Sequence, residues 1–318
     1  MSNLSSGLRA ALEETYSISG LKTLRRSSSI DGTVKFLFEL ADRLSIESVL
    51  IPEANRLTLC ISTQAGCGFG CAFCATALMG LKRSLGASEI VDQVLEARRS
   101  LPAEKRITHA VLMGMGEPLA NYNQTLSAVR IMSDADWGIG ISSRRITLST
   151  VGLVPQMKRL MEESNINLAI SLHATTDEIR SQLMPVNRKY PLAELMDCCR
   201  SLPLPKRRRI TFEYVVLRGI NHSEEDARRL SKLLTGIRSK INLIPFNPHP
   251  GSSYHRPTAE EIAQFQNALR VRGHQVNIRD PRGNDIQAAC GQLWTESGTV
   301  QSSRSNVEHR TLDIALGE

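Results

Sequence analysis

The sequence predicts an α/β fold in which parallel strands form an incomplete barrel and helices cover its outside. From residue 57 onward, short β-branched runs alternate with longer amphipathic runs, which is typical of repeated strand–helix units. No glycine-rich dinucleotide fingerprint follows the first strand, so a barrel is favoured over a doubly wound sheet. The chain has 318 residues, 41% of them hydrophobic, and can bury a sizeable core without disulfides.

Residues 1–56 differ from the rest and are predicted to be a short N-terminal accessory segment. Two short helices are expected here, over residues 8–18 and 34–44, with the polar turn SSSIDGT between them. A segment of this size cannot form a robust core alone, so we expect it to pack on the residues that follow.

The barrel core is predicted over residues 57–295. Its strands are expected at 57–63, 107–113, 145–150, 166–173, 209–217, 241–246 and 275–279. Helical patterns fill the gaps at 87–99, 123–134, 154–163, 191–202, 223–237 and 258–272. Ser88 is the predicted cap of the first of these helices, and Asn221-His222-Ser223 is expected to cap the fifth. The polar residues 296–318 are predicted to be a flexible tail.

The charge balance favours a polyanionic partner. Lys and Arg number 39 against 32 acidic residues, which gives a net charge of +7. Three basic groups stand out, although a charge run is usually a solvated face: Lys206-Arg207-Arg208-Arg209; Lys22, Arg25 and Arg26; and Arg270, Arg272, Arg279 and Arg282. No apolar run approaches the roughly 20 residues that span a bilayer, and the N-terminus lacks the apolar region of a signal peptide. We therefore expect a cytoplasmic protein that does not enter a membrane.

The seven cysteines carry the strongest chemical signal. Their number is odd and no secretory signal precedes them, so metal binding or catalysis is favoured over a disulfide framework. Cys67, Cys71 and Cys74 have the spacing C-x3-C-x2-C in a glycine-rich loop, which allows three thiolates to converge on one iron–sulfur cluster. One iron would then lack a protein ligand and could bind a substrate or cofactor. The loop follows the first strand, on the face where βα barrels carry their chemistry.

Two alternatives compete with an iron–sulfur cluster at this loop. A structural zinc site normally has four ligands, and neither a second C-x2-C nor a histidine pair accompanies these three cysteines. The other alternative is three unrelated buried cysteines, which is disfavoured because free cysteines seldom cluster in this way. Cys198 and Cys199 lie in a helical pattern without other site signals and are interpreted as packing residues.

The cysteine loop, with an aromatic residue before its last cysteine, resembles that of the radical S-adenosylmethionine (SAM) superfamily. Further motifs in the same order resemble the RlmN/Cfr family of radical SAM RNA methyltransferases, and the likeness runs from about residue 31 to 293. These motifs are GMGEPL (114–119), LSTVG (148–152), SLHA (171–174), MPVNRKYPL (184–192), FEYVVLRGIN (212–221), LIPFNPHPG (243–251) and RGNDIQAACGQL (282–293). The resemblance implies a partial (β/α)6-type TIM barrel.

The same resemblance assigns roles to individual residues. It implies that Cys67, Cys71 and Cys74 bind one [4Fe–4S] cluster, and that Cys290 becomes S-methylated while Cys60 acts as the second catalytic cysteine. It places SAM contacts at Gly116, Glu117, Ser149, Ser171, Leu172, His173 and Asn247. Glu47 aligns with a glutamate proposed as proton acceptor.

Taken alone, several of these residues have plainer interpretations. Cys60 would be a core thiol in a strand, and His173 a hydrogen-bonded core histidine. Glu47 would be a surface carboxylate, and GMGEP an ordinary turn at a strand end.

The implied reaction is radical methylation of an adenine ring carbon with two SAM molecules per turnover. Cys290 would carry the methyl group, and Cys60 would release the product through a transient disulfide bond. We expect methylation of C2 in 23S rRNA and possibly tRNA, by a monomer that receives electrons from a donor such as flavodoxin or ferredoxin. Methylation of C8, as by Cfr, and a radical SAM reaction on another substrate remain alternatives. Family members usually carry a longer stretch before the DGT motif at Asp31, implicated in holding RNA, which leaves the substrate open.

Overall fold

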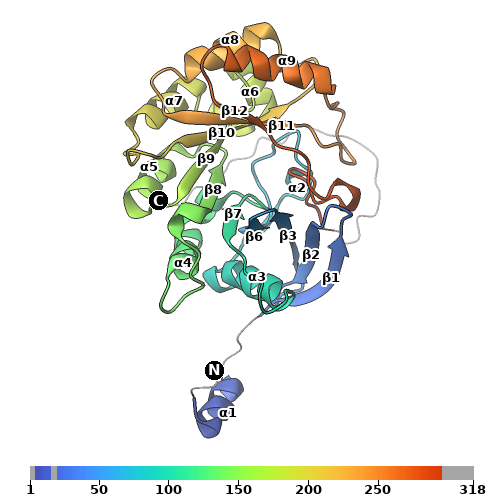
Figure 1. The fold of residues 1–318 in the computed structure, drawn as a ribbon, viewed down its shortest axis with the longest axis vertical. Helices are drawn as coiled ribbons and strands as arrows, with labels where there is room; N and C mark the ends of the chain where they lie inside the picture. Colours follow the sequence, from blue (N-terminus) through green and yellow to red (C-terminus); the bar gives the residue numbers. More distant parts are fainter. Residues whose placement is uncertain (1–3, 16–19, 296–318) are drawn as a thin grey trace.

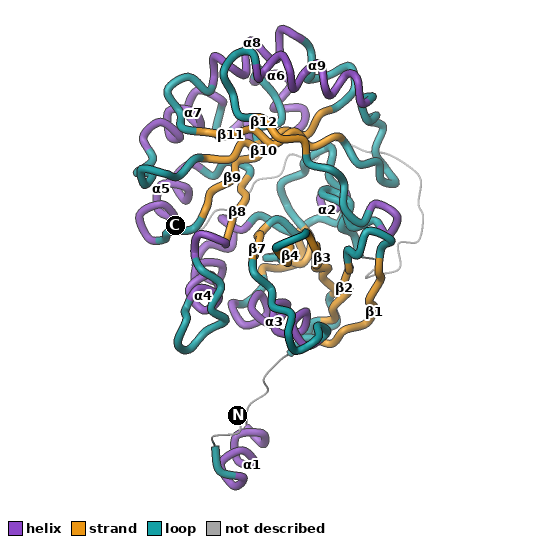
Figure 2. Tube along the Cα trace, in the orientation of Figure 1, coloured by secondary structure: helices purple, strands orange, loops and turns teal. Residues whose placement is uncertain are grey.

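The computed structural model describes residues 4–15 and 20–295 and contains one open sheet covered by helices (Figures 1 and 2). Seven strands of the sheet run parallel in the order β4, β7, β8, β9, β10, β11, β12. Their bounds are β4 Arg56–Cys60, β7 His109–Leu112, β8 Ile146–Thr150, β9 Asn167–Ser171, β10 Ile210–Val216, β11 Ser239–Pro245 and β12 Val276–Ile278. All seven predicted strands are confirmed.

The helices after residue 57 also follow the prediction. They are α3 Ala87–Arg99, α4 Tyr122–Ser133, α5 Val154–Glu163, α7 Leu192–Ser201, α8 Glu224–Leu233 and α9 Ala259–Arg270. Figure 1 shows α5, α7, α8 and α9 along an arc outside the strands. Ser223 caps α8, since its side chain accepts from the backbone N–H of Asp226 at 3.1 Å. The predicted cap Ser88 is wrong, because Gly86 occupies the cap position of α3. The side chain of Glu89 accepts a hydrogen bond from the backbone N–H of Gly86.

The predicted helix over residues 34–44 is wrong. Residues Val34–Glu39 form β2, between β1 Lys22–Ser28 and β3 Ser45–Glu53, and these strands pair antiparallel up to β4. The alternation of Val34, Phe36 and Phe38 places three apolar side chains on the buried face, which stabilises a strand. Residues 22–53 thus extend the barrel sheet, and the expected domain boundary at residue 56 stays a prediction. The other predicted N-terminal helix is present as α1 Ser6–Thr15.

Three shorter elements complete the fold near the cysteine loop. These are α2 Ala75–Leu78 and the pair β5 Gln64–Gly66 and β6 Leu81–Ser84; α6 Asp177–Leu183 follows β9. The ends of the main sheet, β1 and β12, do not pair with each other in the described residues, so the barrel is open. The predicted tail, residues 296–318, lies outside the described part of the chain.

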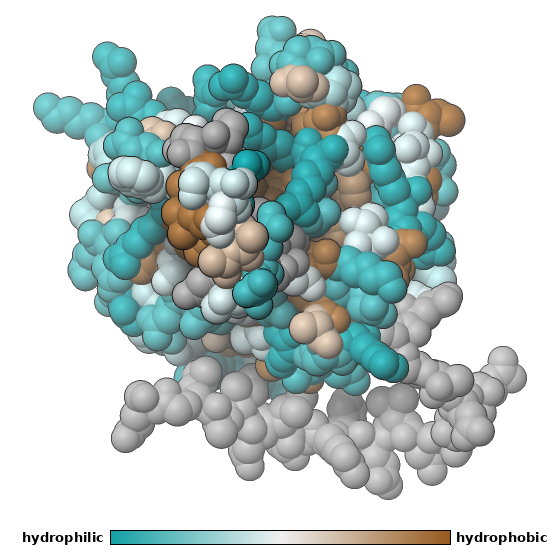
Figure 3. All heavy atoms as spheres, turned by 90° about the horizontal axis from the view of Figure 1, so that it is seen from below, coloured by the Kyte–Doolittle hydropathy of each residue, from teal (hydrophilic) through white to brown (hydrophobic). Residues whose placement is uncertain are grey.

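The core lies between the parallel strands and the outer helices. Leu112, Leu148, Ile170, Phe212 and Leu243, one from each of five neighbouring strands, are fully buried. Seen from below, the surface is mostly hydrophilic, with separate hydrophobic patches (Figure 3). Among the described residues, no helix has the length and apolar character needed to cross a membrane.

Candidate active site

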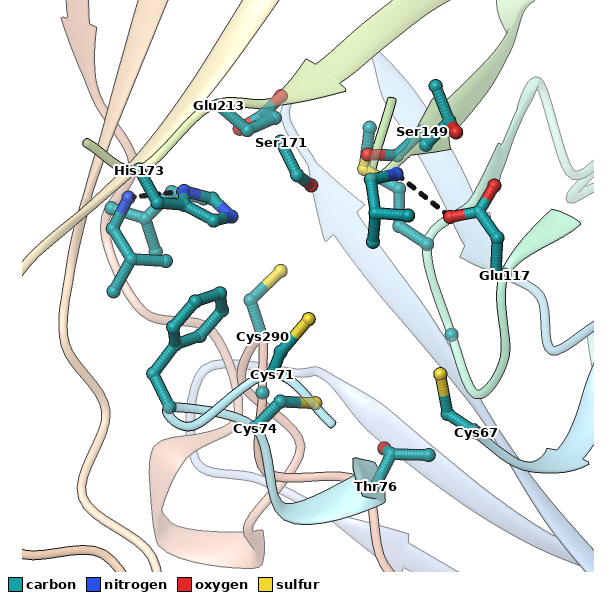
Figure 4. Close-up of a pocket in the computed structure, with 18 of the residues that line it drawn as sticks. Cys67, Cys71, Cys74, Thr76, Glu117, Ser149, Ser171, His173, Glu213 and Cys290 are labelled. Carbon is teal, nitrogen blue, oxygen red and sulfur yellow. Dashed lines mark hydrogen bonds between the residues drawn. The ribbon is translucent and has the colours of Figure 1, made fainter. Parts of the chain in front are cut away.

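A pocket opens at the carboxyl ends of the parallel strands, against the cysteine loop (Figure 4). Most of the predicted site residues line it: Cys67, Cys71, Cys74, Gly116, Glu117, Ser149, Ser171, His173, Asn247 and Cys290. Cys60, Glu47 and Leu172 are not among the lining residues, and Leu172 is fully buried in the core. The position agrees with the rule that barrel chemistry occurs where the strands end.

The three clustered thiols lie on one wall of the pocket. Cys71 and Cys74 lie on one side of this wall and Cys67 on the other (Figure 4). The loop turns at Gly66, whose φ is +78° and where a Cβ atom would collide with the carbonyl oxygen of Gly80. Burial raises the pKa of the Cys67 thiol to about 12 and raises that of Cys71 well above its usual value. Three deprotonated thiols in this buried place would therefore need a bound cationic group to compensate their negative charge.

The donor set fits a four-iron cluster better than a single ion. Within the described residues, no three His, Cys, Asp or Glu side chains are arranged to hold a metal ion. The three thiols nevertheless border one pocket, as ligands at three corners of a larger cluster would. The same pocket is also lined by the polar residues expected to contact SAM, so the three cysteines could hold a cluster beside the site for SAM.

Glu117 is the buried carboxylate on that second wall. Its carboxyl oxygens accept from the N–H groups of Val151 at 2.8 Å and Leu119 at 3.0 Å. Burial outweighs these hydrogen bonds and raises its pKa to about 7. Gly116 beside it has a φ of +97°, and a Cβ there would collide with Gln64. A carboxylate in this position can accept from a bound ammonium group.

His173 has a fixed orientation and protonation. The N–H of Val215 donates to its Nδ1 at 3.0 Å, so the imidazole proton lies on Nε2. Burial lowers the pKa of His173 to about 3, which keeps the ring neutral. The ring contacts Phe73 of the cysteine loop edge-on at 4.6 Å between centroids. His173 is thus both hydrogen-bonded in the core and exposed to the pocket.

Cys290 lies on a loop that packs against the cysteine loop. The N–H of Ala75 donates to the carbonyl of Gly291 at 2.8 Å, and Asn247 Nδ2 donates to the carbonyl of Cys290 at 3.2 Å. Cys290 is exposed as a whole residue, and its thiol points into the pocket (Figure 4). Burial raises its pKa, whereas the nearby Arg279 lowers it. The loop therefore presents this thiol to the space between the cluster ligands and the strand ends.

Cys60 lies at the end of β4 and is only 8% exposed. Burial raises its pKa to about 12, the proximity of Cys290 adds to the rise, and Arg279 opposes it. Two cysteines 230 positions apart are thus within electrostatic range of each other, and both are free thiols. Cys198 and Cys199 are buried in the core, as predicted for packing residues.

Glu47 is buried rather than at the surface, with an exposed fraction of 1%. Its carboxylate forms an ion pair with Lys35 at 2.9 Å and accepts from the N–H of Trp294 at 2.9 Å. Lys35 Nζ also donates to the carbonyl of Gln287 at 3.2 Å. Burial raises the pKa of Glu47 while Lys35 lowers it, and the net direction is upward. In this arrangement Glu47 holds the segment that carries Cys290.

Three charged residues near the pocket were not predicted as site residues. Arg180 is fully buried, and its guanidinium donates to the carbonyls of Val151, Ser171 and Leu172, which joins the ends of β8 and β9. Glu213 and Arg279 line the pocket. Glu213 stands within the motif FEYVVLRGIN, and its polar character inside an apolar strand could have indicated it.

The comparisons with known proteins agree with this geometry. The Radical SAM superfamily pattern matches residues 61–231. The chain is 52% identical over 297 residues to a protein of Syntrophobacter fumaroxidans named dual-specificity RNA methyltransferase RlmN, covering 93% of this chain and 86% of the relative. An equally named protein of Geobacter sulfurreducens is 52% identical, covering 92% of this chain and 80% of the relative.

A solved structure shares the fold over most of its length. The crystal structure of a radical SAM methyltransferase from Sphaerobacter thermophilus superposes with a TM-score of 0.88 at 45% identity, covering 92% of this chain and 86% of the other. The predicted partial barrel is confirmed by this likeness and by the seven parallel strands. The chain therefore belongs to the RlmN family of radical SAM methyltransferases.

Proposed function

We propose that the protein methylates C2 of an adenine in RNA, with 23S rRNA as the first candidate substrate and tRNA as the second, and with Cys290 as the methyl carrier. The observation that carries the proposal is the place of Cys290, which lines one pocket with Cys67, Cys71 and Cys74 and lies within electrostatic range of Cys60. The relatives named RNA methyltransferases support RNA as the substrate class.

Cys67, Cys71 and Cys74 would hold the [4Fe–4S] cluster, and Glu117, Ser149, Ser171, His173 and Asn247 would surround SAM. When bound, the cluster and two SAM molecules per turnover supply the methyl group and a one-electron route to a carbon radical, with electrons from a donor such as flavodoxin or ferredoxin. Such a route suits an adenine ring carbon, which has no lone pair with which to attack a methyl group.

Cys290 and Cys60 would act in two successive steps, methyl transfer and product release. Cys290 would take a methyl group on its sulfur, and this group would lose a hydrogen atom to the radical that SAM supplies. Its carbon then bonds to the base, and loss of the ring proton and one electron gives a covalent protein–RNA adduct. The Cys60 thiolate then attacks the Cys290 sulfur, so an S–S bond forms and the S–C bond breaks. The electron pair of the broken bond stays on the carbon, which takes up a proton and becomes the methyl group of the product.

Glu47 remains the proposed acceptor of the ring proton. Because its carboxylate is held by Lys35 and Trp294 outside the pocket, it must leave these partners to reach the base. Arg279 lies near both catalytic cysteines and stabilises whichever of them is a thiolate.

The test is anaerobic reconstitution with iron, sulfide and SAM, followed by incubation with RNA that lacks the modification and mass spectrometry of its nucleosides. We expect 2-methyladenosine. Formation of 8-methyladenosine would assign the C8 reaction instead. SAM cleavage without any methylated nucleoside, from rRNA or tRNA, would contradict an RNA substrate.

A further inference from the structure

We propose that the protein binds the phosphate backbone of its RNA on a second surface, at the end of the barrel opposite the pocket. This surface, here called the basal strip, consists of cations at the amino ends of β7, β8, β10 and β11. Its members are Arg106, Arg144, Arg145, Lys206, Arg207, Arg208, Arg209 and Arg238. The inference rests on the proposed RNA substrate and adds the place where the backbone is held.

The strip is continuous across neighbouring strands. Register places Ile146 of β8 beside Ala110 of β7, and Ile210 of β10 beside Ser239 of β11, so the residues just before these strands lie in one row. Asn167 of β9 donates to the carbonyl of Arg144 at 2.8 Å.

The loops before the strands are also tied to one another. Arg208 donates to the carbonyl of Ile166 at 2.7 Å, and Arg238 donates to that of Lys206 at 2.7 Å. Burial, followed by the nearby charge of Arg144, lowers the pKa of Arg208. The cations from β8, β10 and β11 therefore share one surface.

The cations of the strip lack acidic partners. Within the part of the chain that the structure describes, none of the eight forms an ion pair, whereas the arginines on the outer helices are mostly paired. Glu163, at the end of α5, is already engaged by Arg130 and Arg159. Like charges gathered on one surface repel each other, and a polyanion relieves this repulsion.

Phosphate binding fits the chemistry of the strip better than base recognition. Arg144, Arg145, Lys206 and Arg207 have exposed side chains, and within the described residues none of these side chains has a hydrogen-bond partner, so their donors are available. All eight members are Lys or Arg, whose side chains offer donors and positive charge but no ring for stacking, and the exposed Trp137 stands outside the strip, earlier in the loop before β8. Such a surface binds phosphates without sequence preference and with a strong dependence on salt.

The position of the strip limits which RNAs can contact the strip and the pocket at the same time. The loop that enters β10 lies at the left edge of Figure 1, away from α2, which directly follows the cysteine loop. The seven residues of β10 alone separate the two ends of the barrel by about 20 Å. A hairpin with a stem of only a few base pairs is too short to reach the strip while its adenine is in the pocket, whereas a large folded RNA can wrap around the barrel and contact both.

The experiment compares two triple variants of the full-length, cluster-loaded protein. In the first, Arg144, Arg145 and Arg207 are replaced by Gln; in the control, Lys22, Arg26 and Arg228, which are exposed cations elsewhere, are replaced by Gln. Both lose three positive charges. Binding is measured from 50 to 300 mM salt with a large rRNA fragment, a short hairpin that contains the target adenine, and vesicles of anionic lipid.

For the large RNA, we expect the first triple variant to bind at least about tenfold more weakly near 0.1 M salt, with the slope of log K against log salt reduced by about 2 to 3. Hairpin binding and hairpin methylation should stay at the control level. Equal losses of RNA binding in both triple variants, or unchanged binding of the large RNA by the first, would overturn the proposal. It would also be overturned if the first triple variant lost binding to the vesicles but not to the large RNA. Absence of methylation of any RNA by the unaltered protein would instead refute the proposed function.

Discussion

At the scale of single residues, Cys60 and Cys290, the two proposed catalytic cysteines, differ in how readily the sequence shows them. Cys290 stands in a recognisable motif, and the structure exposes its thiol to the pocket. Cys60 looks like any core residue, because its neighbours in β4 are apolar and it is 8% exposed. Its proximity to Cys290 depends on tertiary structure, which no local pattern encodes.

The first prediction concerns Cys60. If it resolves the adduct, Cys60→Ala should accumulate with RNA covalently attached through Cys290, because cluster binding and Cys290 methylation use other residues. Cys290→Ala and the double variant should carry no RNA, since the step that needs Cys60 is never reached. The measurement is nuclease-sensitive mass on each purified variant.

A purely structural Cys60 gives a different result. Its replacement by Ala would then leave a small cavity and cost about 1 kcal/mol of stability, with turnover nearly intact. Fully active Cys60→Ala protein without attached RNA would rule out the two-cysteine mechanism here. Cys198→Ala, which removes a buried thiol that does not line the pocket, serves as the matched control.

At the scale of elements, the prediction succeeded where strands and helices alternate regularly. The strand–helix units after residue 57 were predictable because each strand is a short apolar run and each helix has an apolar stripe. The strands of residues 22–53 were not. In VKFLFEL, apolar residues occupy positions that suit a short helix as well as a strand, and only pairing with β3 and β1 decides between them.

The spacing of the cysteine loop alone predicts a metal-binding element, and this stays a prediction. We expect anaerobically reconstituted protein to contain about four irons per chain, and replacement of Cys67, Cys71 and Cys74 by Ala to abolish both iron binding and SAM cleavage. Metal analysis and visible absorption measure the first effect, and 5′-deoxyadenosine formation the second. Stoichiometric zinc without iron would contradict the cluster assignment.

The buried pair Lys35–Glu47 was not predictable, because its two residues meet across β2 and β3 and Trp294, which donates to Glu47, is 247 positions from it in the sequence. Lys35→Met should leave Glu47 buried without its counter-charge and release the carbonyl of Gln287, so the loop of residues 279–295 should loosen. We expect faster hydrogen exchange in this loop and slower methylation of Cys290.

Lys35→Arg is the conservative comparison, since it keeps the charge and can restore part of the ion pair. Its loop exchange and Cys290 methylation should fall between those of Lys35→Met and the unaltered protein. Unchanged exchange in residues 279–295 of Lys35→Met would show that the ion pair does not hold the loop.

At the scale of the whole molecule, side chains join the two ends of the open sheet. β1 and β12 do not pair in the described residues, yet the first strands contact the segment after β12 at several points. The N–H of Gly283 donates to Asp31 at 3.1 Å, and the hydroxyl of Ser29 donates to Asp285 at 2.6 Å. Together with Lys35 and Glu47, these contacts fix the segment that carries Cys290. The family motifs around Asp31 and Cys290 therefore contact each other, and these contacts hold Cys290 in its position at the pocket.

The last prediction tests this support through pH. Burial would raise the pKa of Asp31, but hydrogen bonds from Thr33 and Gly283 outweigh it and lower the pKa to about 2, from 3.8 in the unfolded chain. A carboxyl whose pKa is lower in the folded state stabilises the fold above its unfolded pKa, and this contribution is lost as pH falls through about 2. Asp31→Asn should therefore be less stable than the unaltered protein at pH 7, with the difference shrinking from pH 4 to pH 2. Urea unfolding across this range measures it, with the exposed Asp136→Asn as control for the lost charge. A stability difference that does not change with pH would show that the Asp31 carboxylate does not tie the first strands to the Cys290 segment.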